Sequence, residues 1–311
     1  MRSMAKLSVI VCTYNPGDAV FKSCLEHIKS AAAHCQDLEV IVVDNNSDLP
    51  VSSRDYMASY TSGLFRVVVE TKQGLTPARL KGIQEATGDL LVFVDDDNFI
   101  REDFLVQGLG IAEKNPHIGS YSGQVKLVFE SEPPAWTRPY WGMLVYREFD
   151  KDVWSNLPHL STTMPCGAGL FVRKHVADYY HKLHEEGKRG IQLDRTGKSL
   201  FSGGDNDLAA CACDLGLGVG LFHELVLDHY IPSFRLTEKY LAALSQGIAT
   251  SSIIFKSLRN EQPIAMSLKT RMANMVRLAI MTPMERTMYR AVLEGEEQGR
   301  RMVEYLSEKN L

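Results

Sequence analysis

The chain lacks several patterns that would decide its class at once. Its six cysteines include no CxxC pair and lie mostly in apolar segments, which predicts reduced core thiols rather than a disulfide framework. A formal net charge of -4 offers no basic surface to nucleic acid, so no nucleic-acid partner is expected. No apolar run is long enough to span a bilayer, and no secretory apolar region follows Met1. These absences predict a protein that is made and kept in the cytoplasm.

Two glycine-rich nucleotide loops are also missing. A dinucleotide-binding fold places G-x-G-x-x-G after its first strand, whereas the loop after residues 7–12 contains Gly17 alone. The sequence has no G-x-x-x-x-G-K-[ST] motif, which argues against an ATPase phosphate loop. If the chain binds a nucleotide, it must hold it in another way.

What the sequence does contain is a series of apolar strands that alternate with amphipathic helices. The chain has 311 residues, of which 45% are hydrophobic and 23% charged, as in an ordinary globular protein. Its apolar runs predict strands at residues 7–12, 38–43, 64–70 and 90–94. This alternation predicts an α/β fold with a mostly parallel central sheet flanked by helices.

The fourth of these strands ends in three adjacent carboxylates. Asp95, Asp96 and Asp97 follow five consecutive apolar residues, so they are expected at the C-terminal edge of the sheet, where open α/β sheets bind ligands. Adjacent like charges repel unless a cation is present, and oxygen ligands favour magnesium or manganese. The alternative is an Asp-rich turn that caps a following helix at residues 102–114.

Four ordered motifs in the first hundred residues resemble glycosyltransferase family 2. They are SVIVCTYN, VVDNNS, GLTPAR and FVDDD, at residues 8–15, 42–47, 74–79 and 93–97. The resemblance implies the GT-A fold, which is Rossmann-like. It also implies a metal-dependent, inverting transferase that moves a sugar from a nucleotide-sugar, most commonly of UDP, to a glycan or lipid-linked acceptor in cell-surface polysaccharide synthesis.

The resemblance further implies roles for individual residues. Asp95 and Asp97 would form the DxD that binds Mn²⁺ or Mg²⁺, and His229 would complete the coordination. The nucleotide-sugar would be bound by Thr13, Tyr14, Asn15, Asp44, Asn46, Arg79, Asp95, Asp96, Gly167, Ala168 and Arg235. Structural alternatives remain open: an Asx turn at Asp44, a solvated side chain at Arg79, and packing or hydrogen-bonding roles for Tyr14 and His229.

The catalytic base is expected just after a glycine pair. Gly203 and Gly204 lead into Asp205 and Asp207 at the start of a predicted helix. In the family, a GED-like motif at this place carries the acid that removes the proton of the acceptor hydroxyl, and its Glu is absent here. Asp205 is favoured because it directly follows the glycines, and Asp207 remains the alternative. On the residues alone, either acid could simply cap the helix.

The domain prediction separates a catalytic unit from a tail. Residues 1–258 are expected to form the glycosyltransferase domain, with a nucleotide-sugar half at 1–128 and an acceptor half at 129–258. Residues 259–311 form a helical extension in which methionine and arginine recur at helical spacing. Such a helix could lie on the inner face of an anionic membrane. The alternative is a helical hairpin packed on the catalytic domain or on the second subunit of a homodimer.

Two other functions compete with sugar transfer. A nucleotidyltransferase that forms a sugar nucleotide also needs metal-bound acids, but it normally carries a Gly-rich basic loop after the first strand, and residues 13–18 do not have that character. A binding protein without transfer chemistry is the second alternative, because the expected Glu after the glycine pair is missing.

Overall fold

The computed structural model describes residues 6–61, 63–158, 160–190, 193–195, 200–259, 261 and 267–309. Its first half alternates strands and helices as the apolar pattern predicts. The elements are β1 (Leu7–Thr13), α1 (Asp18–Ala32), β2 (Leu38–Asp44), the short α2 (Ala58–Thr61), β3 (Phe65–Val69), α3 (Leu75–Glu85), β4 (Leu90–Phe93), β5 (Asn98–Ile100) and α4 (Phe104–Lys114).

The second half adds strands to the same sheet, and some of them run antiparallel to their neighbours. Its elements are β6 (Ile118–Phe129), the 3-10 segment η3 (Ala135–Leu144), β7 (Val153–Ser155), β8 (Leu170–Arg173), α5 (Lys174–Glu185), α6 (Gly204–Asp214), β9 (Gly218–Ile231) and η4 (Ser233–Leu236). The described strands form one sheet in the order β3-β2-β1-β4-β8-β6-β9-β5, with β7 paired to β9. Strands β3, β2, β1 and β4 are parallel, whereas β8 is antiparallel to both of its neighbours.

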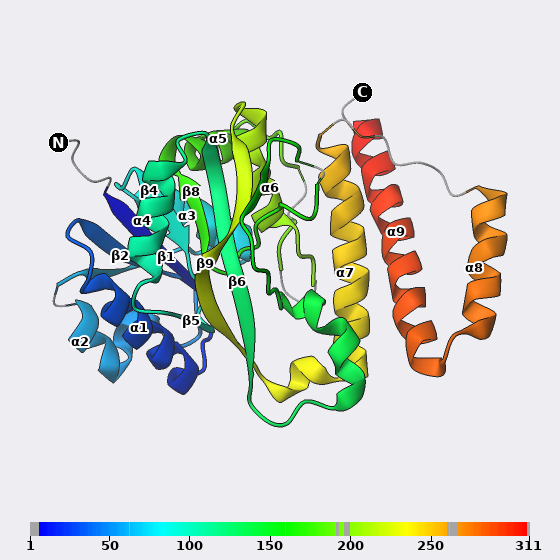
Figure 1. The fold of residues 1–311 in the computed structure, drawn as a ribbon, viewed down its shortest axis with the longest axis horizontal. Helices are drawn as coiled ribbons and strands as arrows, with labels where there is room; N and C mark the ends of the chain where they lie inside the picture. Colours follow the sequence, from blue (N-terminus) through cyan, green and yellow to red (C-terminus); the bar gives the residue numbers. More distant parts are fainter. Residues whose placement is uncertain are drawn as a thin grey trace.

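Helices cover both faces of this sheet (Figure 1). Side chains alternate along β1, so Val9 and Val11 pack with α1 and α4 on one face, while Ile10 packs with α3, α5 and α6 on the other. Because both faces are buried, the strands are almost continuously apolar, and polar side chains gather where the strands end. The expected α/β fold with a mostly parallel sheet is confirmed.

Two elements of the second half lie outside the four strands that the apolar pattern predicted. Strand β9 runs from Gly218 to Ile231 and pairs in parallel with β6. The aromatic segment 132–142 is mostly the 3-10 segment η3, where Trp141 packs against Phe129 with ring centroids 4.9 Å apart. The rings of η3 therefore pack against a small core that is separate from the two faces of the sheet.

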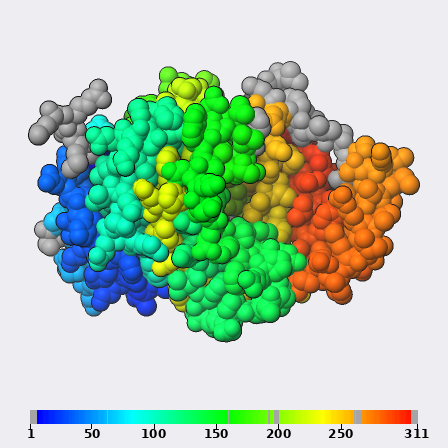
Figure 2. Space-filling view, in the orientation of Figure 1, coloured from blue at the N-terminus to red at the C-terminus, as the bar shows by residue number. Residues whose placement is uncertain are grey.

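Three helices complete the chain: α7 (Glu238–Ser257), α8 (Leu268–Ile280) and α9 (Pro283–Lys309). Helix α9 lies against α7, and their closeness depends on glycine: a Cβ on Gly295 would lie 2.3 Å from the carbonyl oxygen of Gln246. The Thr250 hydroxyl donates to the Gly295 carbonyl across this seam at 3.0 Å. Helix α8 lies beyond α9, at the edge of the molecule (Figures 1 and 2). Among the described residues, no helix combines the length and apolarity needed to cross a membrane.

Candidate active site

A cavity of about 600 Å³ lies where β1 and β4 end. The loop after β1 contributes Thr13 and Tyr14, and the loop after β4 contributes the Asp triplet. The start of α3, the loop before β8, the start of α6 and the end of β9 supply the remaining walls. The sequence-predicted residues that line it are Thr13, Tyr14, Arg79, Asp95, Asp96, Asp97, Gly167, Ala168, Asp205, His229 and Arg235. Segments far apart in the chain thus meet at the edge of the sheet that the strand pattern indicated.

The three carboxylates after β4 differ in their surroundings. The Thr13 hydroxyl donates to Asp96, which orients this side chain toward the end of β1. Burial and the neighbouring Asp97 raise the pKa of Asp96 to about 7. Although burial opposes it, the side chains of His229 and Arg235 hold the pKa of Asp97 well below its ordinary value. The triplet therefore combines one strongly acidic carboxyl with one that binds a proton readily.

Asp97, His229 and Arg235 form a compact cluster. Oδ2 of Asp97 lies 3.0 Å from Nη1 of Arg235 and 3.5 Å from Nε2 of His229. The other ring nitrogen of His229, Nδ1, lies 3.0 Å from the carbonyl oxygen of Leu144, which can only accept. Nδ1 therefore donates to Leu144, and Nε2 faces Asp97 and Arg235.

This cluster has the chemistry of a partial metal site. A metal-binding histidine usually donates one ring N–H to a backbone carbonyl or carboxylate, as Nδ1 of His229 does here, while its other ring nitrogen faces the ion. Asp97 and His229 would supply two ligands, and Asp95 lines the same cavity. Within the described ranges, no group of three or more His, Cys, Asp or Glu side chains is placed to hold a metal ion. Carboxylate oxygens are ligands that Mg²⁺ and Mn²⁺ prefer, so the residues present fit part of a site for such a cation.

Arg79 lines the cavity but is already paired. Its Nη1 donates to both carboxylate oxygens of Asp194 at 2.8 Å, and the Thr76 hydroxyl donates to the same carboxylate at 2.9 Å. Both members of the pair are buried. Although burial opposes it, Asp194 raises the pKa of Arg79 above its ordinary value. The solvated surface role that the sequence left open for Arg79 is wrong.

The two candidate bases at the start of α6 lie in different surroundings. Asp205 lines the cavity, where its Oδ2 accepts the Gly167 N–H at 2.6 Å and its Oδ1 accepts the Asn206 N–H at 3.0 Å. Asp207 is buried away from the cavity and forms ion pairs of 2.8 Å with Arg189 and Arg259. Of the two, only Asp205 is placed where an acceptor hydroxyl could approach.

Other predicted binding residues do not line the cavity. Asp44 accepts the Ser47 N–H at 3.0 Å and the Val51 N–H at 2.9 Å, which is the Asx-type turn left open as its alternative. The amide of Asn15 pairs with Asp48 in the neighbouring loop. Asn46 is exposed and has a left-handed backbone with φ of 61°. Their positions favour shaping of the loops over contact with a ligand in the cavity.

Sequence reasoning missed several residues that line the cavity. Asn45 fixes the loop before α3, because its amide donates to the carbonyls of Glu70 and Lys72 and accepts the Gly74 N–H at 2.7 Å. It stood beside Asp44 in a motif already recognised, so that motif could have pointed to it. The same holds for Cys12, Gly74, Leu75 and Ala78, which stand in recognised motifs. Nothing in the local sequence singled out the others, which are Gln73, Val145, Asp194, Arg195, Phe201 and Ser202.

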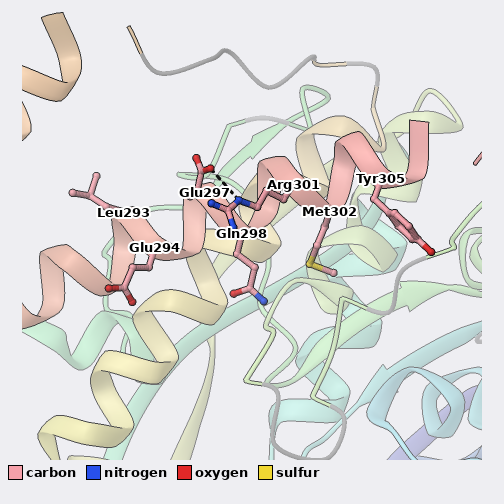
Figure 3. Close-up of a pocket in the computed structure, with 7 residues that line it drawn as sticks. All are labelled: Leu293, Glu294, Glu297, Gln298, Arg301, Met302 and Tyr305. Atoms are coloured by element: carbon pink, nitrogen blue, oxygen red, sulfur yellow. Dashed lines mark hydrogen bonds and ion pairs between the residues drawn. The ribbon is translucent and has the colours of Figure 1, made fainter. Parts of the chain in front are cut away.

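A second hollow, of about 570 Å³, lies along one face of α9 (Figure 3). Its lining residues are Leu293, Glu294, Glu297, Gln298, Arg301, Met302 and Tyr305. All come from a single helix, and the charged pair among them, Glu297 and Arg301, is already joined by a hydrogen bond of 3.1 Å. No set of acids or nucleophiles converges there, so the cavity at the sheet edge is the candidate active site.

The fold and this cavity define an α/β protein in which one site holds the adjacent carboxylates Asp95, Asp96 and Asp97 and, on another segment, the carboxylate of Asp205. Comparison with known families agrees with that description. A model of glycosyl transferase family 2 matches residues 8–178, more than half of the chain, and the chain belongs to this family.

Curated relatives match about a third of the chain in sequence, and solved structures match almost all of it in fold. The uncharacterized glycosyltransferase YibD of Escherichia coli (strain K12) is 35% identical over 99 residues, covering 32% of this chain and 28% of YibD. The chain spans under a third of the length of the first curated relatives that it matches.

Two solved structures resemble the chain over almost its full length. S. aureus TarS 1–349 in complex with UDP has a TM-score of 0.51 and 15% identity, covering 98% of this chain and 92% of TarS. The mannosyltransferase PcManGT of Pyrobaculum calidifontis, in complex with GDP-Man and Mn²⁺, has a TM-score of 0.53 and 17% identity, with coverages of 96% and 88%. At these identities, the likeness shows the GT-A fold.

Proposed function

We propose that this chain transfers a sugar, with inversion, from a nucleotide-sugar to a hydroxyl of a glycan or lipid-linked acceptor in cell-surface polysaccharide synthesis. UDP is the first candidate nucleotide, because one structural neighbour was solved with UDP; GDP is the second, because another was solved with GDP-Man. One observation carries the proposal: the Asp205 carboxylate lies in the same cavity as Asp95, Asp96 and Asp97. A base for the acceptor and a binding cluster for the diphosphate thus share one site.

Asp205 is built to act as the general base. Two backbone N–H groups, of Gly167 and Asn206, hold its carboxylate, and each oxygen keeps a further lone pair. The acceptor O–H would give its proton to Asp205 while its oxygen forms a bond to the anomeric carbon. The bond from that carbon to the diphosphate oxygen would break on the opposite face of the sugar.

Two arginines of the cavity suit the leaving diphosphate. Arg195 and Arg235 line the cavity, and their positive charges would offset the charge that develops as the bond breaks. Residues Asp97 and His229, with Asp95, would hold Mn²⁺ or Mg²⁺, an ion that stabilises the same charge. Thr13 and Tyr14 would contact the nucleotide, since they lie beside the triplet at the end of β1.

The test compares nucleotide binding with turnover in matched variants. Calorimetric titration of UDP, GDP and dTDP, with Mn²⁺ or with EDTA, should identify one nucleotide that binds with metal and loses affinity in Asp97→Ala. With the matching donor, Asp205→Asn should keep that affinity and lose about 10²–10⁴ of the transfer rate. Asp55→Asn, which alters an exposed carboxylate outside the cavity, is the matched control.

Each alternative outcome has a distinct meaning. Full transfer by Asp205→Asn would remove the proposed base, and a product with retained anomeric configuration would overturn the inverting scheme. Metal-dependent binding with no turnover of any donor by the wild type would leave a binding protein that has lost the chemistry of its family. Binding that is unchanged in EDTA would exclude the proposed metal requirement.

A further inference from the structure

Helix α8 presents an apolar face that nothing in the described residues covers. The four most exposed large apolar side chains of the described protein all belong to it: Ile280 at 81%, Leu268 at 75%, Val276 at 64% and Met275 at 62%. Met272 is also exposed. At about 100° per residue, these five side chains fall within one arc of roughly 140°. The helix is therefore amphipathic, with its apolar stripe turned to solvent.

The opposite side of α8 holds it to the rest of the chain. Oδ1 of Asn274, a buried residue, accepts the Tyr289 hydroxyl hydrogen at 2.8 Å. The carbonyl of Leu278 accepts a hydrogen bond of 2.9 Å from Nε of Arg286 at the start of α9. These contacts are polar and fix the orientation of α8, so its exposed face is not free to turn inward without breaking them.

The charges of α8 have a single sign. Between Leu268 and Ile280 the sequence contains Lys269, Arg271 and Arg277 and no acidic residue, although the whole chain has a net charge of -4. Helical spacing places Lys269 about 20° inside the border of the apolar arc at Ile280, and Arg271 about 40° outside the border at Met275. All three cations are exposed. An apolar stripe bordered by cations is the pattern of a helix that lies in the interface of an anionic bilayer.

We propose that α8 docks the protein on a bilayer of anionic phospholipid. The apolar stripe enters the boundary of the acyl chains, and the bordering cations contact the phosphate groups. A second copy of this chain fits the same face less well. A two-fold contact through α8 would bring the two sets of cations together without an acid on either helix. Helix α9 takes no equivalent part, because it packs on α7.

The proposal is tested with the whole chain and vesicles, without donor or acceptor, so it stands or falls independently of the proposed transfer. Protein should float with vesicles of phosphatidylcholine and phosphatidylglycerol, and this partition should weaken as salt is added. Met272→Ser with Val276→Ser should lower the partition about tenfold, since both side chains lie in the stripe. Val106→Ser, an exposed apolar residue on α4, is the control and should have no effect.

A variant that removes positive charge separates the electrostatic contribution to membrane binding from that of the apolar stripe. Lys269→Gln with Arg271→Gln should weaken binding to anionic vesicles and flatten its salt dependence, whereas Lys22→Gln on α1 should change neither. All the altered side chains are exposed, so the thermal midpoint should stay at the wild-type value. The proposal is overturned if wild-type protein does not bind anionic vesicles or if the stripe variant binds equally well. A dimer that the stripe variant dissociates, with no vesicle binding, would assign the face to self-association instead.

Discussion

The guanidinium of Arg235 lies against both Asp97 and His229, two of the residues that would hold a divalent cation. Its Nη1 lies 3.0 Å from Oδ2 of Asp97 and 3.3 Å from Nε2 of His229. Its Nε is buried and has no hydrogen-bond partner in the described part of the chain. The contacts of Arg235 with Asp97 and His229 are made by Nη1, so the side chain can turn away when a divalent cation binds these two residues.

Arg235 and a metal ion should therefore compete. Arg235→Met removes a positive charge next to the ligands, so Mn²⁺ should bind to the nucleotide-free protein about tenfold more tightly than in the wild type. Free Mn²⁺ followed by electron paramagnetic resonance during a titration measures this directly. Asp97→Ala supplies the baseline without a site. If Arg235→Met binds Mn²⁺ no better than the wild type, the guanidinium does not compete for these ligands.

The raised pKa of Asp96 predicts how stability depends on pH. A carboxyl whose pKa is about 7 in the folded state and near 3.9 when unfolded binds its proton more tightly when folded. Stability should then fall as the pH rises through this range. In EDTA, the thermal midpoint of the wild type should drop between about pH 5 and pH 8 more than that of Asp96→Asn. Parallel curves for the two proteins would contradict this assignment.

Much of the donor half could be predicted because its signals are local. Apolar runs predicted β1 to β4, and the acids that follow β4 predicted the edge at which the cavity lies. The Asx turn of Asp44 was also readable, since its partners Ser47 and Val51 lie three and seven positions further on. In such cases the residues that determine the geometry are neighbours in the chain.

The rest of the site depends on partners that are distant in sequence. Arg79 meets Asp194 across 115 positions, so no local pattern could distinguish a buried ion pair from a solvated arginine. Asp205 and Asp207 lie on the same first turn and look equivalent in sequence. What distinguishes the two acids is that Asp207 contacts Arg189, 18 positions before it, and Arg259, 52 positions after it.

The contribution of the Arg79–Asp194 ion pair to stability can be tested by a substitution at Gly204, which packs against Asp194. A Cβ on Gly204 would lie 2.1 Å from Oδ2 of Asp194. Gly204→Ala should therefore displace the carboxylate and lower the free energy of unfolding by about 1–3 kcal/mol, as overpacking does. Gly110→Ala on α4 meets no atom within 4 Å and should raise stability by about 0.4–1 kcal/mol. Denaturant unfolding of both variants gives the comparison, and a stabilised Gly204→Ala would show that the pair tolerates the methyl group.

Neutralising the two acids at the start of α6 should affect different properties: stability for Asp207 and the transfer rate for Asp205. Asp207→Asn leaves the buried guanidinium of Arg189 without its carboxylate and leaves Arg259 with Asp214 alone, so the free energy of unfolding should fall by roughly 3–5 kcal/mol. Transfer per folded molecule should be retained at temperatures where the variant is folded. Asp178→Asn, which breaks an exposed ion pair with Lys174, should cost less than about 1 kcal/mol and serves as the control. An Asp207→Asn protein that is stable and inactive, beside an active Asp205→Asn, would move the base to Asp207 and require its two arginine contacts to open during catalysis.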